Sequence, residues 1–233
     1  MSSFAAPDHV GAVAATILLS VALCVGARLR PGMTAAARVL GAVLIANEVF
    51  YVALLVMRGS WTAQYDLPLY LCDVGAVIAG VALWWPRPLL VEITYFWALA
   101  GTLQGILTPD AYYAFPSYEY WEFYIGHVGV VVAAFVLVVG QGRHPRRSAT
   151  VRVFAITVAF TAVVGVVDAL VNANYMYLRH VPGAGSLLSF MGPWPWYILT
   201  GALLAGLLLM GLDLPFRGAR RRMSASGSRA AAR

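Results

Sequence analysis

Two apolar stretches of this 233-residue chain each carry a side chain that can do covalent chemistry. Cys72 and Asp73 stand side by side in one stretch, and His127 lies in another. An imidazole can take the proton of a thiol, and the thiolate then attacks an acyl carbonyl while an acid or amide orients the imidazole. The three residue types predict acyl transfer or hydrolysis through a Cys/His dyad. Cys72 is the expected nucleophile, His127 the general base, and Asp168 or Asn172 the orienting residue.

The composition requires membrane helices to hold these residues. Hydrophobic residues make up 61% of the chain and charged residues 11%, and the mean hydropathy is +0.76. Too little polar surface remains to cover a water-soluble domain. In lipid each backbone N–H must be satisfied within its own segment, and the apolar runs are about twice as long as barrel strands. The sequence predicts an all-α polytopic bundle with seven transmembrane helices at Val10–Ala27, Arg38–Met57, Leu67–Trp84, Leu89–Leu107, Phe123–Val139, Val153–Asn174 and Trp196–Leu212.

The basic residues predict the orientation of this bundle. The formal charge is +6, but the arginines follow the membrane topology and do not indicate a nucleic-acid partner. By the positive-inside rule the N-terminus is outside and the C-terminus cytoplasmic, with anionic lipid at the cytoplasmic Arg clusters. Residues 1–214 form one transmembrane helical domain, and residues 215–233 form an Arg-rich disordered cytoplasmic tail. Arg58 and Arg179 fall outside, whereas the inner side carries Arg28, Arg30, Arg38, Arg87, Arg143, Arg146, Arg147, Arg152 and the arginines of the tail.

Polar residues of five predicted helices fall in one layer of the outer membrane half. At about 1.5 Å per residue, that layer is roughly 10 Å thick. Buried polar groups are costly in lipid and normally face a bundle interior or a cavity. The layer therefore predicts a polar cavity, open to the outer leaflet, in which the dyad lies. The substrate-contacting residues expected there are Glu48, Asp73, Gln104, Asn172 and Asn174.

Structural interpretations of the same residues stay open. A cysteine in a membrane helix often serves as a small packing residue. An intramembrane histidine also serves in proton relay, metal ligation or hydrogen bonds between helices. Cys24 and Cys72 fall near opposite faces of the membrane, so both are expected to be free thiols. The aromatic stretch at residues 111–121 is either a headgroup belt or a lid over the site.

Five motifs occur together in a familiar order over about residues 40–210. They resemble the YwaF-like family of bacterial integral membrane proteins, which is related to eukaryotic transmembrane protein 164. The motifs are Leu67–Cys72, Gly101–Asp110, Gly126–His127, Asn174–Leu178 and Met191–Tyr197.

The resemblance implies a lipid acyltransferase in the bacterial cytoplasmic membrane. The eukaryotic relative places fatty acyl chains on lysophospholipids, and its catalytic cysteine and histidine correspond by motif to Cys72 and His127. Asn174 and Trp194 belong to the family pattern and are expected at the substrate. Family members often carry histidine at the position of Tyr70. The expected partner is a membrane phospholipid or lysophospholipid, with no cofactor and no metal.

A function from another class accounts for the same polar layer. A membrane protein that binds or transports a small molecule, a proton or a lipid would also place Glu48, Asp73, Asp168 and His127 inside the bundle. The chain shows no internal repeat of the kind that builds many transporters. A purely structural role for Cys72 is the third alternative.

Overall fold

The computed structural model describes residues 7–29, 34–107, 115–181 and 187–231, and within these ranges the chain is helical and forms no strand. The π-helical segment η1 joins α4 to α5, the π-helical segment η2 ends the stretch that begins with α6, and η3 and η4 are 3₁₀ turns. The elements are α1 (Pro7–Leu29), α2 (Thr34–Met57), α3 (Leu71–Trp84), α4 (Pro88–Trp97), η1 (Ala98–Thr102), α5 (Leu103–Leu107), α6 (Tyr118–Phe135), η2 (Val136–Gly140), α7 (Ala149–Val171), η3 (Tyr175–Tyr177), η4 (Leu187–Phe190) and α8 (Trp196–Ala231).

Six helical stretches of the described chain are long and apolar enough to cross a membrane. They agree with six of the predicted segments, so the all-α membrane bundle is confirmed. The third predicted segment is shorter in the structure, because α3 begins at Leu71 and not at Leu67. The six stretches are Val10–Leu29, Ala35–Met57, Pro88–Leu107, Tyr118–Gly140, Ala149–Val171 and Trp196–Gly218.

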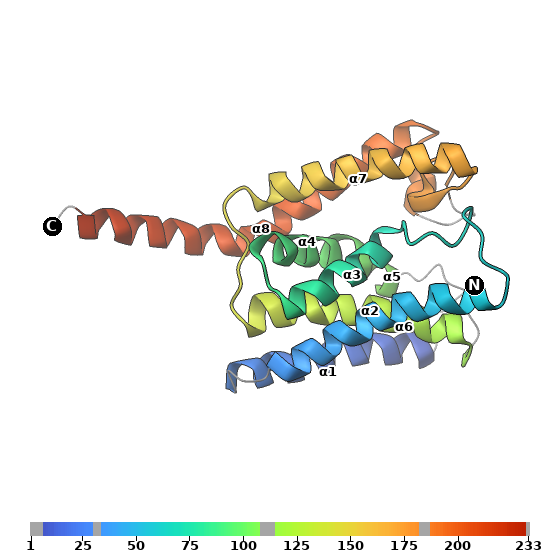
Figure 1. The fold of residues 1–233 in the computed structure, drawn as a ribbon. Coiled ribbons are helices and arrows are strands. Elements are labelled where there is room, and N and C mark those ends of the chain that lie inside the picture. Colours follow the sequence, from blue (N-terminus) through green and yellow to red (C-terminus); the bar gives the residue numbers. More distant parts are fainter. Residues whose placement is uncertain (1–6, 30–33, 108–114, 182–186, 232–233) are drawn as a thin grey trace.

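Successive helical stretches run in opposite directions through the bundle, with α4, η1 and α5 together forming one stretch (Figure 1). The stretch from α4 to α5 and the stretch from α6 to η2 are the central ones, with 56% and 61% of their most apolar window buried. In α1, α2, α7 and α8 that share is 17%, and leucines and valines such as Leu18, Val39, Val163 and Leu203 are exposed. Apolar side chains on the outside are what lipid contact requires, because a lipid-facing surface needs no polar cover.

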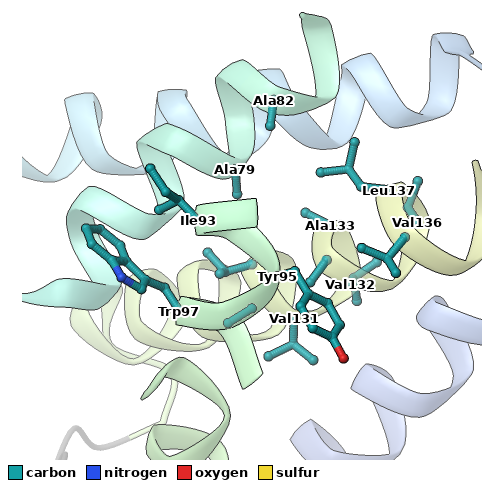
Figure 2. Packing of buried hydrophobic residues seen from close by; sticks show 14 of the residues in the cluster. Ala79, Ala82, Ile93, Tyr95, Trp97, Val131, Val132, Ala133, Val136 and Leu137 are labelled. Carbon is teal, nitrogen blue, oxygen red and sulfur yellow. The ribbon is translucent and has the colours of Figure 1, made fainter. Parts of the chain in front are cut away.

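The core lies between α3, α4 and α6 and is built from small and β-branched side chains. Ala79 and Ala82 of α3 are fully buried, as are Val131 and Ala133 of α6, and Figure 2 shows them in one cluster with Tyr95. Short side chains let helix backbones approach closely in membranes. The phenol of Tyr95 reaches out of this core and donates to the carbonyl of Leu212, at 3.1 Å, which connects α4 to α8.

Crossing of α2 and α3 depends on two glycines. A Cβ added to Gly41 would lie 2.7 Å from the carbonyl oxygen of Gly80, and one added to Gly80 would lie 2.8 Å from that of Gly41. Such approaches exclude any side chain at either position. The crossing fixes α2 beside α3, and so brings Glu48 of α2 towards the start of α3.

A buried carboxylate connects α4 to α7 and to the segment that precedes α7. Glu92 is 1% exposed and accepts from Arg146 Nε at 2.8 Å and from Arg152 Nη2 at 2.9 Å. The backbone N–H of Arg146 also donates to Glu92, at 3.0 Å. A buried carboxylate is tolerated when charged donors surround it in this way.

The long C-terminal helix begins at Trp196, as predicted, but its C-terminal end differs from the prediction. Helix α8 continues through Pro215 to Ala231, as the long helix that projects from the bundle in Figure 1, where the sequence predicts a disordered tail. Its start is preceded by the cis peptide bond Trp194–Pro195.

Residues 111–114 of the predicted aromatic loop lie outside the described residues, and its second half forms the first turn of α6 after the N-cap Ser117.

Candidate functional site

Cys72 lies in the first turn of α3, immediately inside the helix N-terminus. Tyr70 is the extended N-cap residue, and its N–H donates to Asp73 Oδ2 at 3.3 Å. The thiol of Cys72 donates to the other carboxyl oxygen of Asp73, also at 3.3 Å. Cys72 is half-buried and is a free thiol, as is Cys24, as predicted. The helix N-terminus and an adjacent proton acceptor therefore both act on this sulfur.

Carboxyl groups from three helices gather around the start of α3. Glu48 of α2 is buried, and the carboxyls of Asp73 and Glu122 are near enough to interact with it electrostatically. Cys72 is also near enough to Glu48 to interact with it electrostatically. Asn47 connects the group to α6, because its amide donates to the carbonyl of Glu122 at 3.1 Å. Three acids at this depth form an acidic polar centre inside the bundle.

The imidazole of His127 is held between α6 and α5. Its Nδ1 lies 2.8 Å from the carbonyl oxygen of Phe123, and its ring stacks on that of Phe123 with centroids 4.0 Å apart. A carbonyl oxygen only accepts, so Nδ1 carries the hydrogen and, in the neutral ring, Nε2 is the basic nitrogen. Nε2 lies beside the backbone of Gly105.

Cys72 and His127 are not hydrogen-bonded to each other. Among the described residues the thiol bonds to Asp73 and the imidazole to Phe123. Both belong to the same region of the bundle, since Glu48 lies close to Gly126, the neighbour of His127, as well as to Asp73. The structure places the two residues in one region of the bundle, at the matched depth that the sequence predicts. The thiol of Cys72 and the imidazole of His127 nevertheless hydrogen-bond to different groups.

Asp168 and Asn172 belong to a second polar cluster at the end of α7. Asp168 is fully buried and accepts from the backbone N–H of Tyr175 at 2.9 Å. Asn172 ends α7 in the left-handed conformation, and its side chain accepts from Arg179 at 2.7 Å. Neither side chain hydrogen-bonds to His127 within the described chain. Their contacts hold the turn that follows α7.

This second cluster supports the start of α3 through Tyr175. Its buried phenol accepts from the N–H of Leu67 at 2.8 Å and donates to the carbonyl of Ala63 at 3.0 Å. Burial raises the pKa of Tyr175, so the phenol stays protonated and able to donate. The rings of Tyr70 and Tyr175 meet edge to face at 5.5 Å. The turn after α7 therefore positions the residues that precede Cys72.

Comparison with known proteins identifies the family. A family model described as the TMEM164 family matches residues 4–212. The chain belongs to the TMEM164 family. No curated protein and no solved structure matches it. The relation to transmembrane protein 164 expected from the motifs is thereby confirmed.

The remaining expected site residues of this TMEM164-family chain lie in different places. Asn174 holds the turn after η3, accepting from the N–H groups of Arg179 and His180 at 2.9 and 3.1 Å. Trp194 is 62% exposed and donates to the carbonyl of Leu178 at 3.1 Å. Gln104 of α5 is exposed, one residue before the glycine that faces His127. Asn174 and Trp194 thus shape the outer turns, and Gln104 is on the outside of the bundle.

Two residues of the candidate site were absent from the predicted set. Glu122 precedes the predicted helix Phe123–Val139, whereas α6 begins at Tyr118 and includes it. Gly105 was part of a motif without an assigned role. The sequence signal for Glu122 is Ser117, because a serine can cap a helix N-terminus and would start this helix before Phe123. In the structure its side chain accepts from the backbone N–H of Tyr120. Among the described residues no group of three His, Cys, Asp or Glu side chains has the arrangement of a metal site.

Proposed function

We propose that this TMEM164-family protein is a membrane-embedded acyltransferase, or acyl-lipid hydrolase, that acts on phospholipid acyl chains with Cys72 as nucleophile. The observation that carries the proposal is the hydrogen bond from Cys72 to Asp73 at a helix N-terminus, inside a membrane bundle. A thiol with a neighbouring proton acceptor is the basic unit of thiol-dependent acyl transfer. The family membership supports a role in lipid chemistry.

The reaction would proceed in two steps. In the first, the thiol proton passes to a base, the sulfur forms a bond to the ester carbonyl carbon of a phospholipid, and the ester C–O bond breaks. The departing lysophospholipid alkoxide takes the proton, leaving an acyl thioester on Cys72. In the second step the hydroxyl of another lysophospholipid, or water, loses a proton to the base and attacks the thioester, which restores the thiol.

Two residues are candidates for the base. Asp73 is the one already hydrogen-bonded to the thiol. His127, the partner in a Cys/His dyad, offers Nε2 on the neighbouring helix and would join Cys72 only after its ring or the start of α3 moves. Asp168 or Asn172 would orient the imidazole only after leaving Tyr175 or Arg179. The contacts therefore favour Asp73 for the first proton transfer.

The proposed setting is a bacterial cytoplasmic membrane, with α3 as the seventh membrane helix and the N-terminus outside. The supporting observation is that the acidic centre and the arginine-rich helix ends lie at opposite ends of the bundle. Cys72 would then meet phospholipids of the outer leaflet. Anionic lipid would meet the cytoplasmic arginines, which in the described chain include Arg28, Arg38, Arg87, Arg143, Arg146, Arg147, Arg152 and Arg217.

Trapping the acyl thioester tests the proposal. The purified protein is incubated in nanodiscs with phosphatidylcholine that carries an alkyne-tagged acyl chain, and labelled peptides are identified by mass spectrometry. The expected result is a hydroxylamine-sensitive acyl group on Cys72 and its loss in Cys72→Ala. Cys24→Ala is the matched control, because Cys24 is a free buried thiol of α1. Acyl exchange that continues in Cys72→Ala would falsify the covalent mechanism.

Proton-coupled transport is the second candidate, and the cluster of Glu48, Asp73 and Glu122 favours it. Acidic side chains inside a membrane bundle commonly carry protons. In liposomes with a trapped pH-sensitive dye, transport predicts proton movement that Glu48→Gln abolishes and Cys72→Ala leaves intact. Acyl transfer predicts no such proton movement and a thioester on Cys72.

A further inference from the structure

A cavity of about 580 Å³ opens at the end of the bundle opposite Cys72. It lies where α1, the segment η2, η1 and α8 meet. Leu99, Phe135, Val139 and Phe216 contribute apolar walls, and Arg28, Gln141 and His144 are the polar lining residues. An apolar cavity of several hundred Å³ with a few polar groups has the usual make-up of a site for an organic ligand.

The π-helical end of α6 builds one side of this cavity. Segment η2 contributes Val138, Val139 and Gly140 to the lining, and it ends at the C-cap Gln141. Carbonyl groups at a helix end lack intrahelical donors. Arg28 of α1 supplies one, because its Nε donates to the carbonyl of Val139 at 3.2 Å. This bond fixes the guanidinium at the cavity, and within the described chain its terminal nitrogens make no further hydrogen bond.

The charged groups around the cavity favour an anion. Asp213, the acidic residue of α8, interacts electrostatically with the lining residue Tyr95 and is paired with Arg217 at 2.9 Å. Arg143 donates to Gln141 at 3.1 Å, and the ring of His144 lies over that of Phe216 with centroids 5.4 Å apart. The charge of Asp213 is thus balanced by Arg217, whereas Arg28 and Arg143 have no carboxylate partner among the described residues. A guanidinium is the preferred protein group for a phosphate.

We propose that this cavity is a binding site for an anionic phospholipid of the arginine-rich side, distinct from the Cys72 centre. The phosphate would bind Arg28 and His144, and one acyl chain would lie against Val139, Phe135 and Leu99. The apolar walls select a lipid over a soluble phosphate, because a free phosphate gains nothing from them. Only the choice of leaflet rests on the proposed orientation.

Binding is measured by native mass spectrometry and by fluorescence of a pyrene-labelled lipid in detergent micelles, so that the result does not depend on orientation. Phosphatidylglycerol is expected to bind about tenfold more tightly than phosphatidylcholine with the same chains, because both carry the same phosphodiester but the positive choline of phosphatidylcholine is repelled by the guanidinium of Arg28. Arg28→Gln is expected to remove that preference. Val139→Trp is expected to reduce binding of both lipids, because it fills the mouth of the cavity.

Matched controls separate the site from general effects. Arg58→Gln removes an arginine at the other end of the bundle, whose ion pair with Glu119 is exposed and 3.5 Å long. Val158→Trp adds the same bulk on a 48% exposed position of α7. Both are expected to bind as wild type does. Cys72→Ala is expected to bind phosphatidylglycerol normally, which keeps this site independent of acyl transfer.

Three results would overturn the proposal. The first is equal affinity for the two lipids. The second is wild-type binding in both Arg28→Gln and Val139→Trp, each checked for helix content by circular dichroism. The third is competition by glycerol 3-phosphate at the same concentration as the lipid, since that would show that the phosphate alone is recognised. Loss of acylation at Cys72 with lipid binding intact would refute acyl transfer only.

Discussion

His127 lies directly against the backbone of Gly105. A Cβ added to Gly105 would be 2.7 Å from Nε2 of the imidazole and 2.6 Å from its Cδ2. Helix α5 therefore approaches α6 at a distance that leaves no room for a side chain. Together with the stack on Phe123, the contact confines the imidazole between two helices.

Gly105→Ala is expected to displace the imidazole and destabilise the protein by about 1–3 kcal/mol, the usual cost of overpacking a filled site. Gly201→Ala is the matched control, because a Cβ there would have nothing within 4 Å. In a helix that control should be neutral or slightly stabilising. Denaturant unfolding in detergent gives the free energies, and the His127 ¹⁵N resonances report the ring. Equal stability of the two variants would contradict the close contact.

Asp73→Asn is expected to slow acylation of Cys72 by about 10²–10⁴-fold, the usual contribution of a general base. Asparagine keeps an oxygen that can accept from the N–H of Tyr70, so the start of α3 should be retained. Single-turnover acylation by the alkyne-tagged phospholipid is the measurement. His127→Gln is the comparison: if it slows acylation and Asp73→Asn does not, the imidazole is the base.

Arg146 and Arg152 are expected to act redundantly on Glu92. Each single change to Ala leaves Glu92 one guanidinium, whereas the double variant leaves a buried carboxylate without a charged partner. Leaving a buried carboxylate without any charged partner typically costs about 3–5 kcal/mol, so the double variant should lose more free energy of unfolding than the two single variants together. Arg143→Ala is the control, because its side chain bonds to Gln141. Additive losses would refute the redundancy.

Tyr175→Phe is expected to destabilise the protein by about 1–3 kcal/mol, because the N–H of Leu67 and the carbonyl of Ala63 lose their partner. Tyr65→Phe, at a side chain that is 71% exposed, should have no measurable effect. Thermal unfolding in detergent compares the two. Hydrogen exchange at residues 67–72 should rise in Tyr175→Phe, and protection that is unchanged there would show that the phenol does not hold the start of α3.

The membrane helices were predictable because length and hydropathy determine them. Six segments agree with the structure to within a few residues at most of their ends. The start of α3 was not predictable, since Leu67 and Leu69 are as apolar as the helix that follows. Their backbone is fixed by Tyr175, which is more than a hundred residues away in the chain.

The depth of the candidate site residues in the bundle was predictable, but the direction of their side chains was not. Counting residues along each helix brought Glu48, Asp73 and His127 to one region, because helical rise is constant. Which way each side chain points depends on helix rotation, which the Gly41–Gly80 and Gly105–His127 contacts set. Asp168 has the same depth and turns to Tyr175 instead. Asn172 and Asn174, which follow Asp168, are typical of a helix end and a turn. They were the sequence signal that Asp168 supports a turn and does not belong to the candidate site.

The shortness of α3 has a consequence for the surrounding lipid. Its 14 residues extend for about 21 Å, less than the roughly 30 Å of a hydrocarbon core. A membrane thins locally around a segment that is too short for it. Water and glycerol ester groups would thereby be drawn inward beside α3, to the depth of its first turn. Hydrophobic mismatch would then deliver the ester to the thiol, with no need for the lipid to leave the bilayer.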